Sequence, residues 1–259
     1  RRRMSTKTVQ GKRQRFYLLD GLRLCAALAV VFYHYTAFGA HSVWGIPSSE
    51  KFPGLSHVTA FGALGVQLFF VISGFVIVLS AHGRTVRQFA ASRISRLYPG
   101  YWVAVMAAAV LYLGIDRNGF KDVSASDAVV NLTMMQEAVG AKHLDGVYWT
   151  LWVELLFYIL VALIIPFGLT EGKIMALAFL WPVVGAMAKT AKVDLLDDFL
   201  NPTYAPFFAG GMVLYLIHAY GHSMMRWLLL GFNVCLGIRH AGAGWITGNI
   251  PDDTGIHIS

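Results

Sequence analysis

The sequence predicts an all-α protein, a polytopic bundle of transmembrane helices. Of the 259 residues, 56% are hydrophobic and only 14% are charged, whereas about a quarter of the residues of a soluble domain are charged. The apolar residues form several runs of about 20, the length that a helix needs to cross a bilayer. The net charge of +7 comes mainly from lysines and arginines at the ends of these runs. That distribution is typical of topology signals and argues against a nucleic-acid-binding surface.

Residues 1–16 form a strongly basic segment, which we expect to lie in the cytoplasm because positive charge favours that side. Met4 is taken as the natural start, so the three arginines before it are set aside. We expect no cleavable signal peptide, because the first apolar run is too long and no small-residue cleavage site follows it. This run, residues 22–39, is therefore expected to cross outward.

The next spans are expected to alternate in direction. A loop rich in Gly, Pro and Ser separates the first span from the second, at 61–80. Between the second and third spans lie four arginines and no acidic residue, as expected of a cytoplasmic loop. Pro99 is expected in the first turn of the third span, 98–115, where proline is tolerated. Ser73 and Gly74 in the second span are interpreted as small residues that let helices approach closely.

The second half continues the same pattern. Residues 116–148 are more polar and contain a segment, DAVVNLTMMQEA, that is too short to cross and is expected to form a re-entrant or interfacial helix. Residues 225–238 are apolar but short, so they are counted as an uncertain seventh span. Six to seven spans are therefore expected within a membrane domain at 17–238. Residues 239–259 are polar and Gly-rich and are interpreted as a disordered or non-native tail. The remaining spans are expected at 149–168, 173–189 and 203–219, with an acidic loop at 194–198.

Two ionisable residues lie within the first span, Arg23 and His34. Such residues are costly inside a membrane and are candidates for a functional site. Eleven residues correspond to about three helical turns and about 16 Å, so both side chains leave the same face of the helix at different depths. A general base needs a pKa near the working pH, which histidine as a residue type supplies with little tuning. The alternative is that Arg23 extends to the headgroups and His34 is a hydrogen-bonded core residue.

Three further residues are candidates. Arg93 and Arg96 are three apart and share a helical face, where they could bind phosphate oxygens, unless they only anchor the chain at the membrane surface. Glu154 lies in the fourth span, where a carboxylate needs a partner. It could pair with an arginine or orient a histidine, or it could serve a structural salt bridge or a protonated hydrogen bond.

Other kinds of site find no support in the sequence. We find no serine-nucleophile, Walker or metalloprotease motif, so His34, if it acts, is expected to deprotonate a substrate hydroxyl directly. Cys25 and Cys235 lie far apart in apolar runs. They predict neither a disulfide nor a metal site, and we expect a packing role for both.

Five stretches, taken together and in this order along the chain, resemble the motifs of a known family. They are LLDGLRLCAALAVVFYHY, GVQLFFVISGFVI, ASRISRLYPGYW and YWTLWVELLFY, followed by YAPFFAGGMVLYLI. Each is weak alone, but the ordered set over residues 17–220 resembles the acyltransferase 3 family of integral-membrane acyltransferases.

The resemblance implies an activity and a site. Members use about ten membrane helices to move an acyl group, commonly acetyl, from cytoplasmic acyl-CoA to a carbohydrate or other cell-envelope acceptor. A bacterial inner membrane is the implied location, with no tightly bound cofactor and no metal. The family's first-span Arg and His match Arg23 and His34, its arginine pair matches Arg93 and Arg96, and its fourth-span Glu matches Glu154. The implied roles are catalysis for His34, Arg23 and Glu154, and CoA binding for the arginine pair.

The chain departs from the family pattern at two places. Leu24-Cys25 stand where a small residue usually follows the first-span arginine. The chain also turns polar after the sixth span, so it is expected to be a short member or a sequence truncated or frame-shifted near residue 221. Two alternatives remain open: a transporter or flippase whose pathway is lined by Arg, His and Glu, and an inactive fragment of the acyltransferase.

Overall fold

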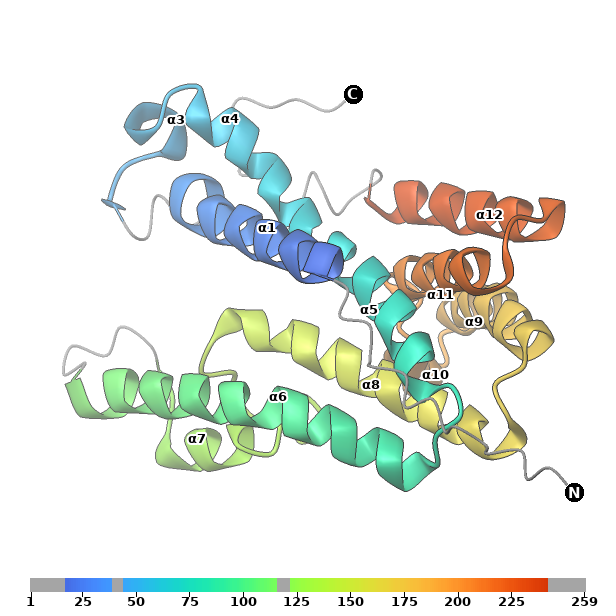
Figure 1. Ribbon diagram of the computed structural model, residues 1–259. Helices are drawn as coiled ribbons and strands as arrows, with labels where there is room; N and C mark the ends of the chain where they lie inside the picture. Colours follow the sequence, from blue (N-terminus) through green and yellow to red (C-terminus); the bar gives the residue numbers. More distant parts are fainter. Residues whose placement is uncertain (1–16, 39–43, 116–121, 242–259) are drawn as a thin grey trace, which may run out of the picture.

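The computed structural model describes residues 17–38, 44–115 and 122–241 (Figure 1). This part of the chain is helical and contains no strand, which confirms the predicted all-α bundle. The basic segment 1–16 and almost all of the polar tail lie outside the described residues.

Five helical stretches in the described part are long and apolar enough to cross a bilayer, close to the first five predicted spans. Two further helices, α11 (Ala205–Tyr220) and α12 (Met224–His240), have 16 and 17 residues, at the short limit for a crossing. They correspond to the predicted sixth span and to the short apolar run after it. The five stretches are Tyr17–Phe38, Leu55–Ala81, Val86–Ile115, Gly146–Phe167 and Glu171–Thr190.

The helices within these stretches keep the labels of Figure 1. α1 (Tyr17–Tyr33) continues as a π-helical turn at His34–Phe38, and the short α3 (Ser48–Lys51) and α4 (Leu55–Thr59) lead into α5. The acidic segment that was predicted as a loop instead forms the short α10 (Asp194–Leu200). The others are α5 (Gly65–Ala81), α6 (Val86–Ala109), α7 (Ala125–Asn131), α8 (Trp149–Ile164) and α9 (Glu171–Thr190).

The third span begins twelve residues earlier than the sequence predicts. A capping box starts α6: Thr85 Oγ1 accepts from the Gln88 backbone N–H at 3.3 Å, and the Gln88 side chain accepts from the Thr85 N–H at 3.2 Å. Pro99 therefore lies inside the helix and not in its first turn. As a consequence, Arg93 and Arg96 lie well inside a helix, which agrees with the predicted shared face but not with their predicted place where the loop enters the span.

The core of the bundle lies where α5 meets α11. Here the two backbones touch, since a Cβ added to Gly211 would lie 2.0 Å from the Val71 carbonyl oxygen and one added to Gly74 would lie 2.1 Å from that of Phe208. The predicted role of Gly74 in close helix approach is thus confirmed. Phe208 is fully buried and packs against Phe70 and Phe157, with ring centroids 4.6 and 4.5 Å apart.

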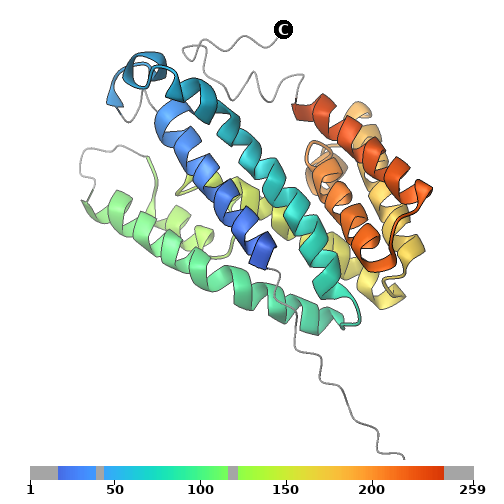
Figure 2. The same ribbon diagram turned by 45° about the horizontal axis from the view of Figure 1, so that its top comes forward.

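α12 is joined to this core by a buried arginine. Arg226 is 7% exposed, and its Nη2 donates to Glu171 Oε1 at 2.5 Å. It also donates to the carbonyl oxygens of Tyr220 and Gly221 at the end of α11. One side chain therefore links the starts of α9 and α12 to the end of α11. Figures 1 and 2 show these three helices gathered on one side of α5.

Residues 122–148 form a polar segment that packs on α6. Tyr101 donates from its hydroxyl to the Asn131 carbonyl at 2.6 Å. The fully buried Asn131 amide donates to the Lys142 carbonyl at 2.8 Å and accepts from the Leu144 N–H at 3.3 Å. Of the segment predicted as a re-entrant or interfacial helix, residues 127–138, only the first five belong to a helix, the short α7, and turns follow it. Hydrogen bonds hold this segment against α6.

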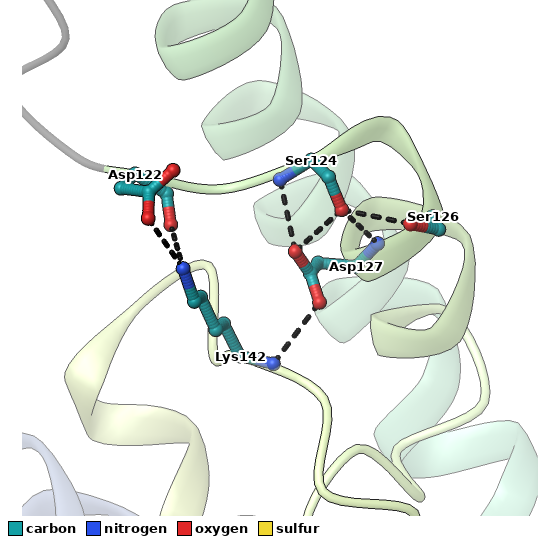
Figure 3. A network of polar contacts seen from close by, with 5 residues as sticks. All are labelled: Asp122, Ser124, Ser126, Asp127 and Lys142. Carbon is teal, nitrogen blue, oxygen red and sulfur yellow. Dashed lines mark hydrogen bonds and ion pairs between the residues drawn. The ribbon is translucent and has the colours of Figure 1, made fainter.

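A second set of polar contacts closes the same segment (Figure 3). Asp127 accepts from the Ser124 hydroxyl at 2.6 Å, from the Ser124 N–H at 2.9 Å and from the Lys142 N–H at 3.1 Å. The Lys142 ammonium pairs with Asp122 at 2.6 Å. These contacts join the start of α7 to a residue 15 positions later along the chain.

This network predicts a pH dependence. Hydrogen bonds from Ser124, and after them the one from Lys142, lower the pKa of Asp127 below its usual 3.8. Stability from a lowered carboxyl pKa is present above the unfolded value and is lost as pH falls through the folded one. We therefore expect the Ser124 and Lys142 amides to lose hydrogen-exchange protection below about pH 4. In Asp127→Asn their protection should not change over that range, and the same acid loss in both proteins would contradict the prediction.

Candidate active site

A cavity of about 790 Å³ lies between α1, α5, α6 and α8. All five residues that the sequence singled out line it, although they come from three helices and span 131 positions: Arg23, His34, Arg93, Arg96 and Glu154. Its size is within the range of pockets that hold cofactors and small substrates. The structure thus brings the predicted residues together around one space.

One end of the cavity carries most of the charge. Arg23 of α1 interacts electrostatically with Arg96 of α6 and with Glu154 of α8. Arg93 interacts with Arg96, Glu154 and Tyr158. Three guanidinium groups and one carboxylate thus line the same cavity, and the excess of positive charge suits an anionic ligand. We call this the arginine end.

Arg93 and Arg96 differ in their surroundings although they share a helix. Arg93 is only 7% exposed, with its guanidinium 5.9 Å from the centre of the Phe89 ring and its Nη2 3.4 Å from Ser92 Oγ. Its buried Nε has no hydrogen-bond partner among the described residues. Arg96 is exposed while also lining the cavity. A donor without a partner beside an open guanidinium is an arrangement that an anion can complete.

Glu154 is held by neighbours that sequence reasoning did not connect to it. Its Oε1 accepts from Ser73 Oγ of α5 at 2.8 Å, so Ser73 does more than let helices approach. Tyr158, one turn further along α8, lines the cavity and interacts with the same carboxylate. The four-residue spacing of Glu154 and Tyr158 was the available signal, whereas the Ser73 contact joins residues 81 apart and leaves no local pattern.

His34 lies towards the other end of the cavity. It is half-buried at the start of the π-helical turn, and its ring meets the edges of Tyr33 and Phe38 at centroid distances of 5.1 and 5.8 Å. Gly146 and Val147 line the cavity with it. Eleven residues of helix place it about 16 Å from Arg23 along the axis. We call this the histidine end.

Most of the other side chains that line the cavity are apolar, among them Val30, Val66, Phe70, Trp149 and Leu151. An apolar passage with a cationic end and an imidazole at the other suits a long ligand with an anionic head and an uncharged reactive end. Among the described residues, no group of three His, Cys, Asp or Glu side chains could hold a metal ion. Cys25 and Cys235 are free and exposed on the surface of the helices, where they do not pack in the core.

Comparison with known proteins adds a family. A family model described as an acyltransferase domain matches residues 16–253, a range that continues past residue 221. The chain is 29% identical over 149 residues to Acyltransferase MdmB of Streptomyces mycarofaciens, covering 54% of this chain and 37% of that protein. It is 28% identical over 169 residues to Nodulation protein 10 of Rhizobium leguminosarum bv. viciae, covering 57% and 46%.

The name of a third relative includes a reaction. The chain is 27% identical over 170 residues to the Putative peptidoglycan O-acetyltransferase YrhL of Bacillus subtilis, covering 58% of this chain and 24% of that protein. The matched part thus spans less than half the length of each of these three relatives. No solved structure matches the chain.

Proposed function

The chain belongs to the acyltransferase 3 family, and from that premise we propose that it transfers an acyl group, acetyl in the first instance, from acyl-CoA to a hydroxyl of a carbohydrate or cell-envelope acceptor. The observation that carries the proposal is the cavity with an arginine end and a histidine end. The name of the Bacillus relative supports acetyl as the group and the cell envelope as the source of the acceptor.

In this proposal Arg93 and Arg96 bind the CoA phosphates, for which paired guanidinium groups are well suited. The pantetheine arm lies along the apolar passage, so that the thioester reaches the histidine end. Arg23 lies about 16 Å from His34 along α1, which supports donor positioning over contact with the thioester carbonyl. Glu154, held by Ser73 at 2.8 Å, orients the arginines.

His34 acts as the general base. It removes the proton from the acceptor hydroxyl, whose oxygen attacks the thioester carbonyl carbon. The C–O bond forms and the C–S bond breaks. The proton passes from the imidazolium to the departing thiolate, which leaves as CoA. No covalent intermediate on the protein is required, which agrees with the absence of a nucleophile motif from the sequence.

The orientation expected from the sequence fits this order of events. With the basic segment 1–16 in the cytoplasm, the start of α6 with the arginine end faces the compartment that holds acyl-CoA. The histidine end then opens towards the outer side, where an envelope acceptor would approach. We propose the inner membrane of a bacterium as the location.

Radiolabelled acetyl-CoA tests the proposal. Bacterial membranes that contain the protein should release CoA and label an envelope polysaccharide, and both signals should depend on the acceptor. Solute uptake without CoA release would instead support a transporter, and neither signal would be expected of an inactive fragment. Either of these two results would overturn the proposal.

The arginine pair yields a prediction about donor binding. A hydrogen bond to a charged group contributes about 1.5–3 kcal/mol, so Arg96→Ala should raise KM for acyl-CoA roughly tenfold and the double change with Arg93→Ala roughly 100-fold. The ratio to wild type should be largest at low ionic strength, where screening is weakest.

Arg87→Ala is the matched control, because Arg87 is exposed on the same helix and does not line the cavity. Arg96→Ala is the more informative variant, since Arg96 is exposed and its loss leaves no cavity in the core. An unchanged KM in Arg96→Ala, or an equal change in Arg87→Ala, would count against phosphate binding at this end.

A further inference from the structure

We infer that Asp145 is a positioning residue for His34, so that each end of the cavity has its own carboxylate: Glu154 for the arginines and Asp145 for the imidazole. The inference rests on the proposed function and adds a residue to its site.

Asp145 is fixed in place by its neighbours. Leu144 before it is fully buried and donates its N–H to Asn131 Oδ1 at 3.3 Å. Three residues after it, Tyr148 is 4% exposed and packs against Tyr101 with ring centroids 5.1 Å apart. The chain between these two anchors has little freedom to move.

The carboxylate itself is also held. Asp145 Oδ1 accepts from the Val147 N–H at 3.1 Å and caps the short helical turn Gly146–Tyr148. Gly146 and Val147 line the cavity together with His34. The carboxylate of Asp145 therefore lies within hydrogen-bond distance of the cavity wall that Gly146 and Val147 form.

The two carboxylates, Asp145 and Glu154, belong to different ends of the cavity. Asp145 lies just before the start of α8 and Glu154 lies more than a turn into that helix, so the two carboxylates stand at different depths along the cavity, as His34 and Arg23 do along α1. Glu154 acts on Arg23 and Arg93 and on the hydroxyl of Tyr158. The sequence left open whether Glu154 pairs with an arginine or orients a histidine, and its hydrogen bond from Ser73 and its depth along α8 favour the arginines.

A carboxylate near an imidazole assists proton transfer. It favours one orientation of the ring and stabilises the imidazolium that forms when His34 takes the proton from the acceptor hydroxyl. In this role Asp145 touches neither the acyl group nor the acceptor. Its loss should slow the chemical step without weakening the binding of the donor phosphates at the arginine end.

Two substitutions separate the charge of Asp145 from its capping role. Asp145→Asn keeps an oxygen that can cap the turn, since Asn and Asp cap equally well, but removes the charge. Asp145→Glu keeps the charge, but glutamate is a poor cap for the helical turn. We expect kcat to fall roughly 10- to 100-fold in Asp145→Asn, with KM for acetyl-CoA and the melting temperature unchanged, and to fall less in Asp145→Glu.

Asp122→Asn is the matched control, because Asp122 is an exposed carboxylate of the same segment that pairs with Lys142. If Asp145→Asn keeps the wild-type kcat while His34→Ala is inactive, the assignment of Asp145 is overturned and the proposed function remains intact. A higher kcat in Asp145→Asn than in Asp145→Glu would also overturn the assignment, because activity would then depend on the cap and not on the charge. A wild-type protein without acyl transfer would overturn the function and this assignment together.

Discussion

Replacing His34 by alanine is expected to lower kcat for acyl transfer by about 10²- to 10⁴-fold, the usual contribution of a positioned general base. The imidazole is the group at its end of the cavity that can accept a proton at neutral pH. The side chain is half-buried beside the cavity, so its removal enlarges an existing space and should leave membrane insertion intact. Initial rates with labelled acetyl-CoA at saturating acceptor measure the effect.

His57→Ala is a suitable control for this experiment. His57 is exposed in α4, close to the same end of α1, and does not line the cavity. We expect it to keep wild-type activity. Transfer at the wild-type rate by His34→Ala would remove the general base from the proposal, and an equal loss in His57→Ala would point to a general effect on the fold.

Replacing Gly211 by alanine is expected to disrupt the bundle. The added Cβ would lie 2.0 Å from the Val71 carbonyl oxygen and 2.9 Å from the Phe75 backbone nitrogen. Both atoms belong to the backbone of α5, so no side-chain rotation can relieve the overlap and the two helices must separate. Overpacking of a core costs about 1–3 kcal/mol or more, and we expect the upper part of that range. Thermal unfolding in detergent, followed by tryptophan fluorescence, measures the change.

Replacing Gly231 by alanine is expected to leave the stability of the bundle unchanged or to increase it. This glycine lies within α12, and a Cβ added there would meet nothing within 4 Å. In an open helical position alanine is favoured over glycine by up to about 1 kcal/mol, so Gly231→Ala should leave the melting temperature unchanged or raise it. Equal destabilisation by both changes would show that the α5–α11 contact does not limit stability.

The candidate site was predictable in its members but not in its arrangement. An ionisable residue within an apolar run is visible in the sequence because burial of charge in a membrane is costly, and Arg23, His34 and Glu154 were found for this reason. Arg93 and Arg96 were found by their spacing. Asp145 gave no such signal, since it lies in a polar segment where an aspartate is ordinary.

Pro99 shows why element boundaries were harder to predict than elements. Proline favours the first turn of a helix, and the apolar run begins beside it, so both signals placed the helix start near residue 98. The capping box at Thr85 and Gln88 instead begins the helix before a polar stretch. Hydrophobicity reports which part of a helix the membrane covers, whereas hydrogen bonds at the cap decide where the helix begins.

The sequence by itself determined the membrane-spanning helices, the ionisable residues among them and the resemblance to a family, because each depends on composition or local spacing. Only the tertiary structure decided that the five residues line one cavity, and that Ser73 holds Glu154 across 81 positions. The physical reason is that a hydrogen bond or a charge interaction depends on distance in space. Residues on α1, α5, α6 and α8 become neighbours only when the helices pack.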